Sequence, residues 1–222
     1  MTNEASNLRD PSSSPHTRSS GSRQRLIDAM AELLWEKGYA ATSPRDVMSA
    51  ASVGQGSFYH HFSGKHELAV AALRQNIAET LEDSAGIEAS SPLEELKAYL
   101  LRPRPGLKGC RVGRMTQDPK VLQDQELLGL VEDAFTATAQ RWERLIGAAV
   151  DAGELPRTLD PQQLARTLAA VLQGGYVLSR AYGSQQPMDD AVGGMASLLD
   201  SLAQSQRNFM ATTSFMATTN KE

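Results

Sequence analysis

The chain has 222 residues, of which 41% are hydrophobic and 22% are charged, and its formal net charge is −4. These values are ordinary for a globular protein with a sizeable core, and the single cysteine, Cys110, excludes an intramolecular disulfide. Residues 1–22 lack the apolar core of a signal peptide, and no apolar run approaches the ~18 residues of a membrane span. We therefore expect a cytoplasmic protein without membrane contacts.

The balance of charge differs slightly between the N-terminal part and the rest of the chain. Residues 1–65 carry seven Lys or Arg and six Asp or Glu, so the acidic excess lies in the rest of the chain. This distribution permits nucleic-acid binding by the N-terminal part and argues against it elsewhere.

Helical patterns follow one another along the chain, and no alternating strand pattern interrupts them. The Ser- and Pro-containing residues 1–21 are expected to form a disordered arm. Helices are expected at about 22–37, 43–51, 55–61, 64–81, 91–101, 110–117, 128–153, 160–182 and 187–204, before a disordered tail over 205–222. The sequence therefore predicts an all-α fold.

Residues 43–62 have the pattern of a helix, a tight turn and a second helix. Their apolar residues are expected to pack inward, which leaves polar side chains on a small exposed helix of the size that fits the major groove. Gln55 is suited to bidentate contact with adenine, and Tyr59 and His60 to phosphates or base edges. The predicted DNA-binding residues are Thr42, Ser43, Arg45, Gln55, Ser57, Tyr59, His60 and Lys65.

The stretch from Arg23 to Leu73 resembles the DNA-binding domain of TetR-family transcriptional regulators. The matching markers are Leu34, Gly38-Tyr39, Thr42, Arg45-Asp46-Val47, Ala50-Ala51, Val53, Gly56 to Phe62, and Lys65 to Leu68. Pro44 and Gly64-Lys65-His66 depart from the usual pattern without removing a DNA-facing group.

The resemblance implies a helix-turn-helix DNA-binding domain over 22–66 and a larger helical domain for ligand binding and dimerisation over 67–204. It also implies a homodimer that binds double-stranded operator DNA and represses adjacent genes until an unknown small-molecule effector releases it. Activation instead of repression stays open.

The candidate ligand residues in the second domain are Cys110, Met115, Trp142 and Tyr176. Cys110 is either a small buried hydrophobe or a sensor thiol whose thiolate nearby basic residues would favour. Trp142 and Tyr176 either belong to the core or line a pocket between helices. The last two long helices are expected to form the dimer interface, with Leu199 on its apolar seam. The pairs Gly174-Gly175 and Gly193-Gly194 either permit close approach of two subunits there or break the helices.

Other classes of function fit the sequence less well. No nucleophile elbow, P-loop, dinucleotide fingerprint or zinc-protease motif is present, so we expect neither an enzyme nor a cofactor. His60, His61 and His66 lack neighbours at metal-ligand spacing, so no metal site is expected. A helical protein-interaction adaptor would explain the acidic second part, but not the polar side chains gathered on one exposed helix.

Overall fold

The computed structural model describes residues 15–82, 87 and 89–219. Within these ranges the chain forms eight α-helices, one short 3-10 helix and no strand, which confirms the all-α prediction. The elements are α1 (Pro15–Glu36), α2 (Pro44–Ala51), α3 (Gln55–His61), α4 (Lys65–Glu82), α5 (Pro92–Leu101), η1 (Gly113–Gln117), α6 (Gln125–Asp151), α7 (Pro161–Tyr182) and α8 (Gln186–Thr219).

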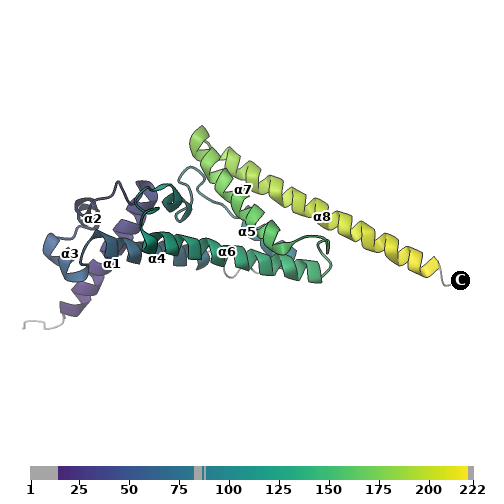
Figure 1. Ribbon diagram of the computed structural model, residues 1–222, viewed down its shortest axis with the longest axis horizontal. Helices are drawn as coiled ribbons and strands as arrows, with labels where there is room; N and C mark the ends of the chain where they lie inside the picture. The colour runs from purple at the N-terminus through teal and green to yellow at the C-terminus, as the bar shows by residue number, and fades with distance from the viewer. Residues whose placement is uncertain (1–14, 83–86, 88, 220–222) are drawn as a thin grey trace, which may run out of the picture.

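The helices form an elongated molecule in which α1, α2 and α3 lie at one end and the far half of α8 extends toward the other (Figure 1). Helices α4 and α6 pack against each other along the middle, and α7 and α8 form an antiparallel pair that packs on α5 and α6. No helix in the described ranges has the length and apolar character needed to cross a bilayer.

The N-terminal core extends well beyond the helix-turn-helix. Helix α1 buries Leu26, Met30 and Leu34 against α4, which contributes Leu68 and Leu73. The same cluster includes residues from the second part of the chain: Val112, Met115, Val121, Leu127, Val131 and Ala134. The predicted domain boundary after residue 66 is therefore not a break in the packing.

A second core occupies the other half of the molecule. It joins α5, α6, α7 and α8, and its largest fully buried side chains include Trp142, Leu96, Leu100 and Ile146. This cluster makes the second part of the chain a packed helical body rather than an extension of the first.

Both ends of the chain differ from the predicted disordered segments. Helix α1 begins at Pro15, so residues 15–21 are helical, and residues 1–14 lie outside the described residues. Helix α8 continues to Thr219, through most of the predicted tail over 205–222. No Pro or Gly follows Gly194, and extending an existing helix needs no new nucleation. A small polar composition therefore did not prevent helix propagation.

Candidate functional site

Two buried phenylalanines hold the predicted recognition helix, α3, in place. Phe58 is fully buried and Phe62, directly after the helix, is 2% exposed; both belong to the N-terminal core. Ser52 has a left-handed conformation, with φ 52°, at the end of α2 and so makes the tight turn toward α3. The outer side of α3 therefore has a fixed position relative to α1 and α2.

Three of the predicted DNA-binding residues share the exposed side of α3. Gln55, Tyr59 and His60 are all exposed, and Gln55 and Tyr59 stand four positions apart on one helix face. Tyr59 is 55% exposed, although its ring packs edge-on against Phe58 with 5.1 Å between the ring centres. A Cβ added at Gly56 would meet nothing within 4 Å, so the helix backbone is accessible as well.

Ser57 has a different role from its exposed neighbours. Its Oγ donates to Ser22 Oγ at 3.3 Å, and Ser22 Oγ lies 3.0 Å from His61 Nε2. These contacts join α3 to α1, so Ser57 orients the helix in addition to any contact with DNA. His66, the third histidine weighed for a metal site, lies not on α3 but at the start of α4, with its Nε2 2.9 Å from Asp124 Oδ2.

At the start of α2, Ser43 and Asp46 cap the helix, whereas Arg45 is exposed to solvent. Ser43 Oγ accepts from the Asp46 amide at 3.2 Å, and the Asp46 carboxylate accepts from the Ser43 amide at 2.9 Å. The hydrogen bonds from Ser43 hold the pKa of the Asp46 carboxyl below its usual range. Thr42 is 2% exposed and donates to the Gly38 carbonyl at 2.7 Å, so it supports the α1–α2 turn instead of facing DNA.

Lys65, at the start of α4, faces the protein more than the sequence indicates. Its Nζ donates to the Tyr39 carbonyl oxygen at 2.5 Å and lies 4.1 Å from the centre of the Tyr39 ring. Partial burial, followed by the charge of Lys120, lowers the pKa of the Lys65 ammonium. Lys65 fastens the α1–α2 turn to α4, and its contact with a phosphate stays a prediction.

A cavity of about 70 Å³ lies among α4, α5, α6 and α7. Its wall brings together three of the predicted ligand residues, Cys110, Trp142 and Tyr176. Met115 does not line this cavity, because η1 directs it into the N-terminal core, where it is 1% exposed. The rest of the wall is mostly apolar and includes Ile77, Leu81, Val112, Ala134, Phe135, Ala169 and Leu172.

Cys110 is partly buried, which fits the first of its two predicted roles, a small hydrophobe, and the sensor thiol stays a hypothesis. Its Sγ accepts from the Gly113 amide at 3.2 Å. Of the three basic neighbours that could favour a thiolate, Lys108 is paired with Glu32 and Arg111 with Glu79, whereas Arg114 lines a neighbouring hollow together with Cys110. Cys110 is a wall residue of the cavity.

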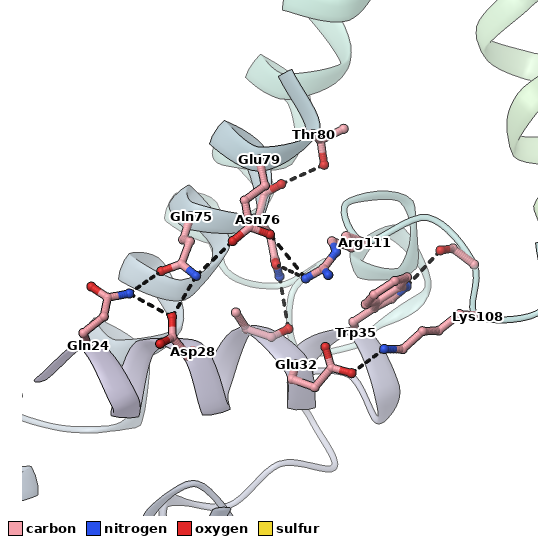
Figure 2. Close-up of polar contacts among 12 residues, drawn as sticks. Gln24, Asp28, Glu32, Trp35, Gln75, Asn76, Glu79, Thr80, Lys108 and Arg111 are labelled. Atoms are coloured by element: carbon pink, nitrogen blue, oxygen red, sulfur yellow. Dashed lines mark hydrogen bonds and ion pairs between the residues drawn. The ribbon is translucent and has the colours of Figure 1, made fainter. Parts of the chain in front are cut away.

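The segment 108–111 connects the cavity wall to α1, a relationship that the sequence did not indicate. Figure 2 shows the Trp35 ring between Lys108 and Arg111, whose cationic groups lie 3.8 Å and 4.0 Å from its centre. Trp35 Nε1 donates to the Gly109 carbonyl at 2.8 Å, and Arg111 also donates to Asn76 of α4 at 3.1 Å. Cys110, in the same segment, faces the cavity.

A second connection joins the DNA-binding end to the segment before α6. The buried Asp118 carboxylate accepts from the Ala40 amide at 2.7 Å and from the Lys120 amide at 3.0 Å. Gly38 has φ +86°, and a Cβ there would lie 2.8 Å from Asp118 Oδ2. The α1–α2 turn therefore has both its backbone conformation and its position set by contact with the second part of the chain.

Helices α7 and α8 carry large apolar side chains that no part of the described chain covers. Val177, Leu178 and Tyr182 of α7 and Leu198 of α8 are between 44% and 71% exposed. Leu199, predicted for the dimer seam, is instead fully buried in the second core of the same chain.

The glycine pairs of these two helices have different surroundings. A Cβ added at Gly174, Gly193 or Gly194 would meet nothing within 4 Å, whereas one at Gly175 would lie 3.0 Å from Met188 Sδ. Gly175 therefore allows α7 to pack on α8 within the chain, and the other three leave open surface.

Comparison with known proteins agrees with this architecture. Residues 26–72 match the family model described as bacterial regulatory proteins, tetR family, and residues 94–195 match that of the tetracyclin repressor-like C-terminal domain. The transcriptional regulator AcuR of Cereibacter sphaeroides is 33% identical over 64% of this chain and 68% of its own length. The transcriptional repressor DhaR of Mycobacterium sp. is 28% identical over 75% and 86%.

Solved structures have the same fold. The regulatory protein TetR from Rhodobacter sphaeroides has a TM-score of 0.71 at 25% identity and covers 79% of this chain and 97% of its own. A TetR regulator from Chloroflexus aurantiacus, with a TM-score of 0.73 at 23% identity over 83% and 96%, shares the fold. The chain therefore belongs to the TetR family of DNA-binding transcriptional regulators. It is a regulator and not an enzyme.

Proposed function

We propose that the chain acts in the cytoplasm as a homodimeric repressor whose two α3 helices enter successive major grooves of a roughly palindromic operator. The observation that carries this proposal is the exposed row of Gln55, Tyr59 and His60 on a helix fixed by buried Phe58. The relative DhaR is named a transcriptional repressor, which favours repression over activation. In such dimers the two helices lie about 34–36 Å apart, one turn of the duplex.

The predicted contacts divide into base contacts and backbone contacts. Gln55 is suited to an adenine edge, and Tyr59 and His60 to base edges or phosphates. Arg45 is exposed beside the N-terminus of α2, where its charge favours a phosphate, and Ser43 lies at the same helix terminus. Neither Gln55 nor Arg45 has a hydrogen bond or ion pair within the described part of the chain, so both side chains are available for DNA.

The second subunit is proposed to cover the outer face of α7 and α8. The exposed side chains of Val177, Tyr182 and Leu198 supply apolar area, and the open surface at Gly174 and Gly194 permits close approach of two helices. A two-fold axis through this face would leave both α3 helices at the far end of the dimer, available to one duplex.

The effector is proposed to bind in the cavity lined by Cys110, Trp142 and Tyr176. Segment 108–111 lies between this cavity and Trp35 of α1, so a ligand that displaces the segment also displaces the helix against which α3 packs. Release of DNA requires that the ligand bind the DNA-incompetent arrangement more tightly than the other.

Footprinting of the purified protein on DNA upstream of its own gene tests the proposal. We expect a protected, roughly palindromic site and a binding constant that falls steeply with salt, because Lys and Arg contacts to phosphate release counterions. Arg45→Ala should weaken binding, while Arg207→Ala on the distant part of α8 is the charge-matched control. Binding to no DNA fragment, or binding without salt dependence, would favour the protein-interaction adaptor instead.

A further inference from the structure

The wall of the cavity carries an unused hydrogen-bond donor. Trp142 is 2% exposed, and its indole Nε1–H has no acceptor in the described structure. A buried donor without a partner loses its hydrogen bond to water, so such groups are uncommon unless a water or ligand completes them. Because Trp142 lines the cavity, this N–H is placed to donate to an occupant.

A buried positive charge lies beside Tyr99 in the same cavity wall. The Arg104 guanidinium lies 5.0 Å from the centre of the Tyr99 ring, and the Trp142 ring centre lies 5.4 Å from it. Arg104 is 9% exposed and donates to the carbonyls of Tyr99, Leu100 and Arg102 at the end of α5. Those carbonyls accept hydrogen bonds from the guanidinium but do not balance its charge, because Arg104 forms no ion pair with any described carboxylate.

The charged residues of the cavity wall are all basic. No described residue that lines the cavity is Asp or Glu, whereas Arg102 and Arg104 both line it. Burial raises the pKa of the Tyr176 hydroxyl to about 12, so this group stays protonated at neutral pH and is able to donate. Most of the other lining residues are apolar. A ligand that fits this wall has a small, negatively charged hydrogen-bond acceptor group and a short apolar chain.

On the proposed ligand-binding role of the cavity, we infer that its effector is a small monocarboxylate with a short apolar chain. The carboxylate accepts from Trp142 Nε1–H and balances the charge of Arg104, and the chain fills the apolar part of the cavity. A neutral amide of the same length fills the same space but leaves Arg104 without a counter-ion. The cavity volume of about 70 Å³ favours chains of a few carbons over large drug-like ligands.

Nuclear magnetic resonance of the indole N–H groups tests this inference directly. The chain has two tryptophans, so a protein labelled with ¹⁵N at the indole gives two such signals, one for Trp142 and one for Trp35. Sodium butyrate and sodium hexanoate at pH 7 should shift the Trp142 signal in a saturable way. Butyramide and hexanamide should bind about tenfold or more weakly, because a hydrogen bond to a charged group is the stronger one.

The variant Trp142→Phe keeps the aromatic ring but removes the donor. It should bind hexanoate about tenfold or more weakly by calorimetry, while Tyr59→Phe, which also removes one donor but lies on α3 away from the cavity wall, should bind it as the original chain does. If Trp142→Phe does not fold, the comparison of acids with amides on the original chain decides alone. Equal affinity for hexanoate and hexanamide, or no binding of either acid, would overturn the inference.

The test is independent of the proposed repressor activity. Ligand binding is measured without DNA, and operator binding is then measured with and without hexanoate. Carboxylate binding that leaves operator affinity unchanged would support the ligand class and contradict effector release. Salt-dependent operator binding by a chain that binds no carboxylate would support the DNA-binding proposal and overturn the ligand class.

Discussion

The Lys108 ammonium lies 3.8 Å from the centre of the Trp35 ring, so a residue next to the cavity wall contacts the C-terminal part of the first helix. Lys108 also pairs with Glu32, one turn earlier on α1. Because Cys110 of the same short segment lines the cavity, the segment has one side toward the ligand space and the other toward α1. The segment is therefore a direct structural connection between the cavity wall and α1, in addition to the packing of α4.

Replacing Lys108 with Met should loosen the end of α1. The cation–π contact and the partly exposed pair with Glu32 together contribute about 0.5–1 kcal/mol, so the loss in global stability should be small. Amide hydrogen exchange over residues 31–36 should nevertheless become faster. The control is Arg207→Met, an exposed cation on α8. Unchanged exchange in the Lys108 variant would mean that this contact does not hold α1.

Gln55→Ala should relax base preference at one position of each half-site. Loss of a bidentate contact to adenine should weaken binding to the operator with the preferred base by about 1–3 kcal/mol. Binding to operators with another base at that position should change little. Binding to all single-base variants of the footprinted operator measures this, with the exposed Gln123→Ala as the control. A profile identical to that of the original chain would remove Gln55 from the base contacts.

Lys65→Ala should weaken operator binding about equally for all sequences. The slope of log affinity against log salt should become shallower by about one unit per subunit, because one phosphate contact is lost. Since Lys65 also holds the Tyr39 carbonyl, a modest loss in thermal stability is expected too. Arg207→Ala controls for the change in net charge. A lower melting temperature with an unchanged salt slope would assign Lys65 to the protein fold alone.

The same substitution at two adjacent leucines of α8 should affect different properties, dimerisation in one case and the stability of the subunit in the other. Leu198 is 60% exposed on the proposed dimer face, so Leu198→Asp should give folded monomers by light scattering. Leu199 is fully buried, so Leu199→Asp should destabilise each subunit by burying an unpaired charge. Folded dimers of the Leu198 variant would show that another surface holds the subunits together.

The helix-turn-helix could be predicted because its signals are local. The capping box of Ser43 and Asp46 and the buried Phe58 and Phe62 follow from spacing within twenty residues. The same spacing predicts the exposure of Gln55 and its neighbours. Local pattern therefore determined both the elements and the outer face of this region.

Contacts between distant segments account for what the sequence did not reveal. Thr42 lies in a stretch of DNA-facing residues, but it is buried in the α1–α2 turn, which Asp118 holds from the second part of the chain. Met115 has the apolar side chain of a pocket residue, but it is buried in the N-terminal core. The Trp35 contact with Lys108 joins two unremarkable sequence positions. No periodicity within either segment carries this information.

The N-terminal core, which continues through α4 into Val112, Val121 and Leu127, limits how this regulator could be recombined with others. A graft that joined residues 1–66 to a foreign effector domain would leave Leu26 and Met30 of α1 without the side chains that cover them. A functional chimaera would need a junction after α4, together with matching residues in place of 108–131. The helix-turn-helix is thus not an independent module that can be exchanged between regulators. Exchanging the few exposed side chains of α3 would change operator specificity with less disturbance of the core than a domain graft.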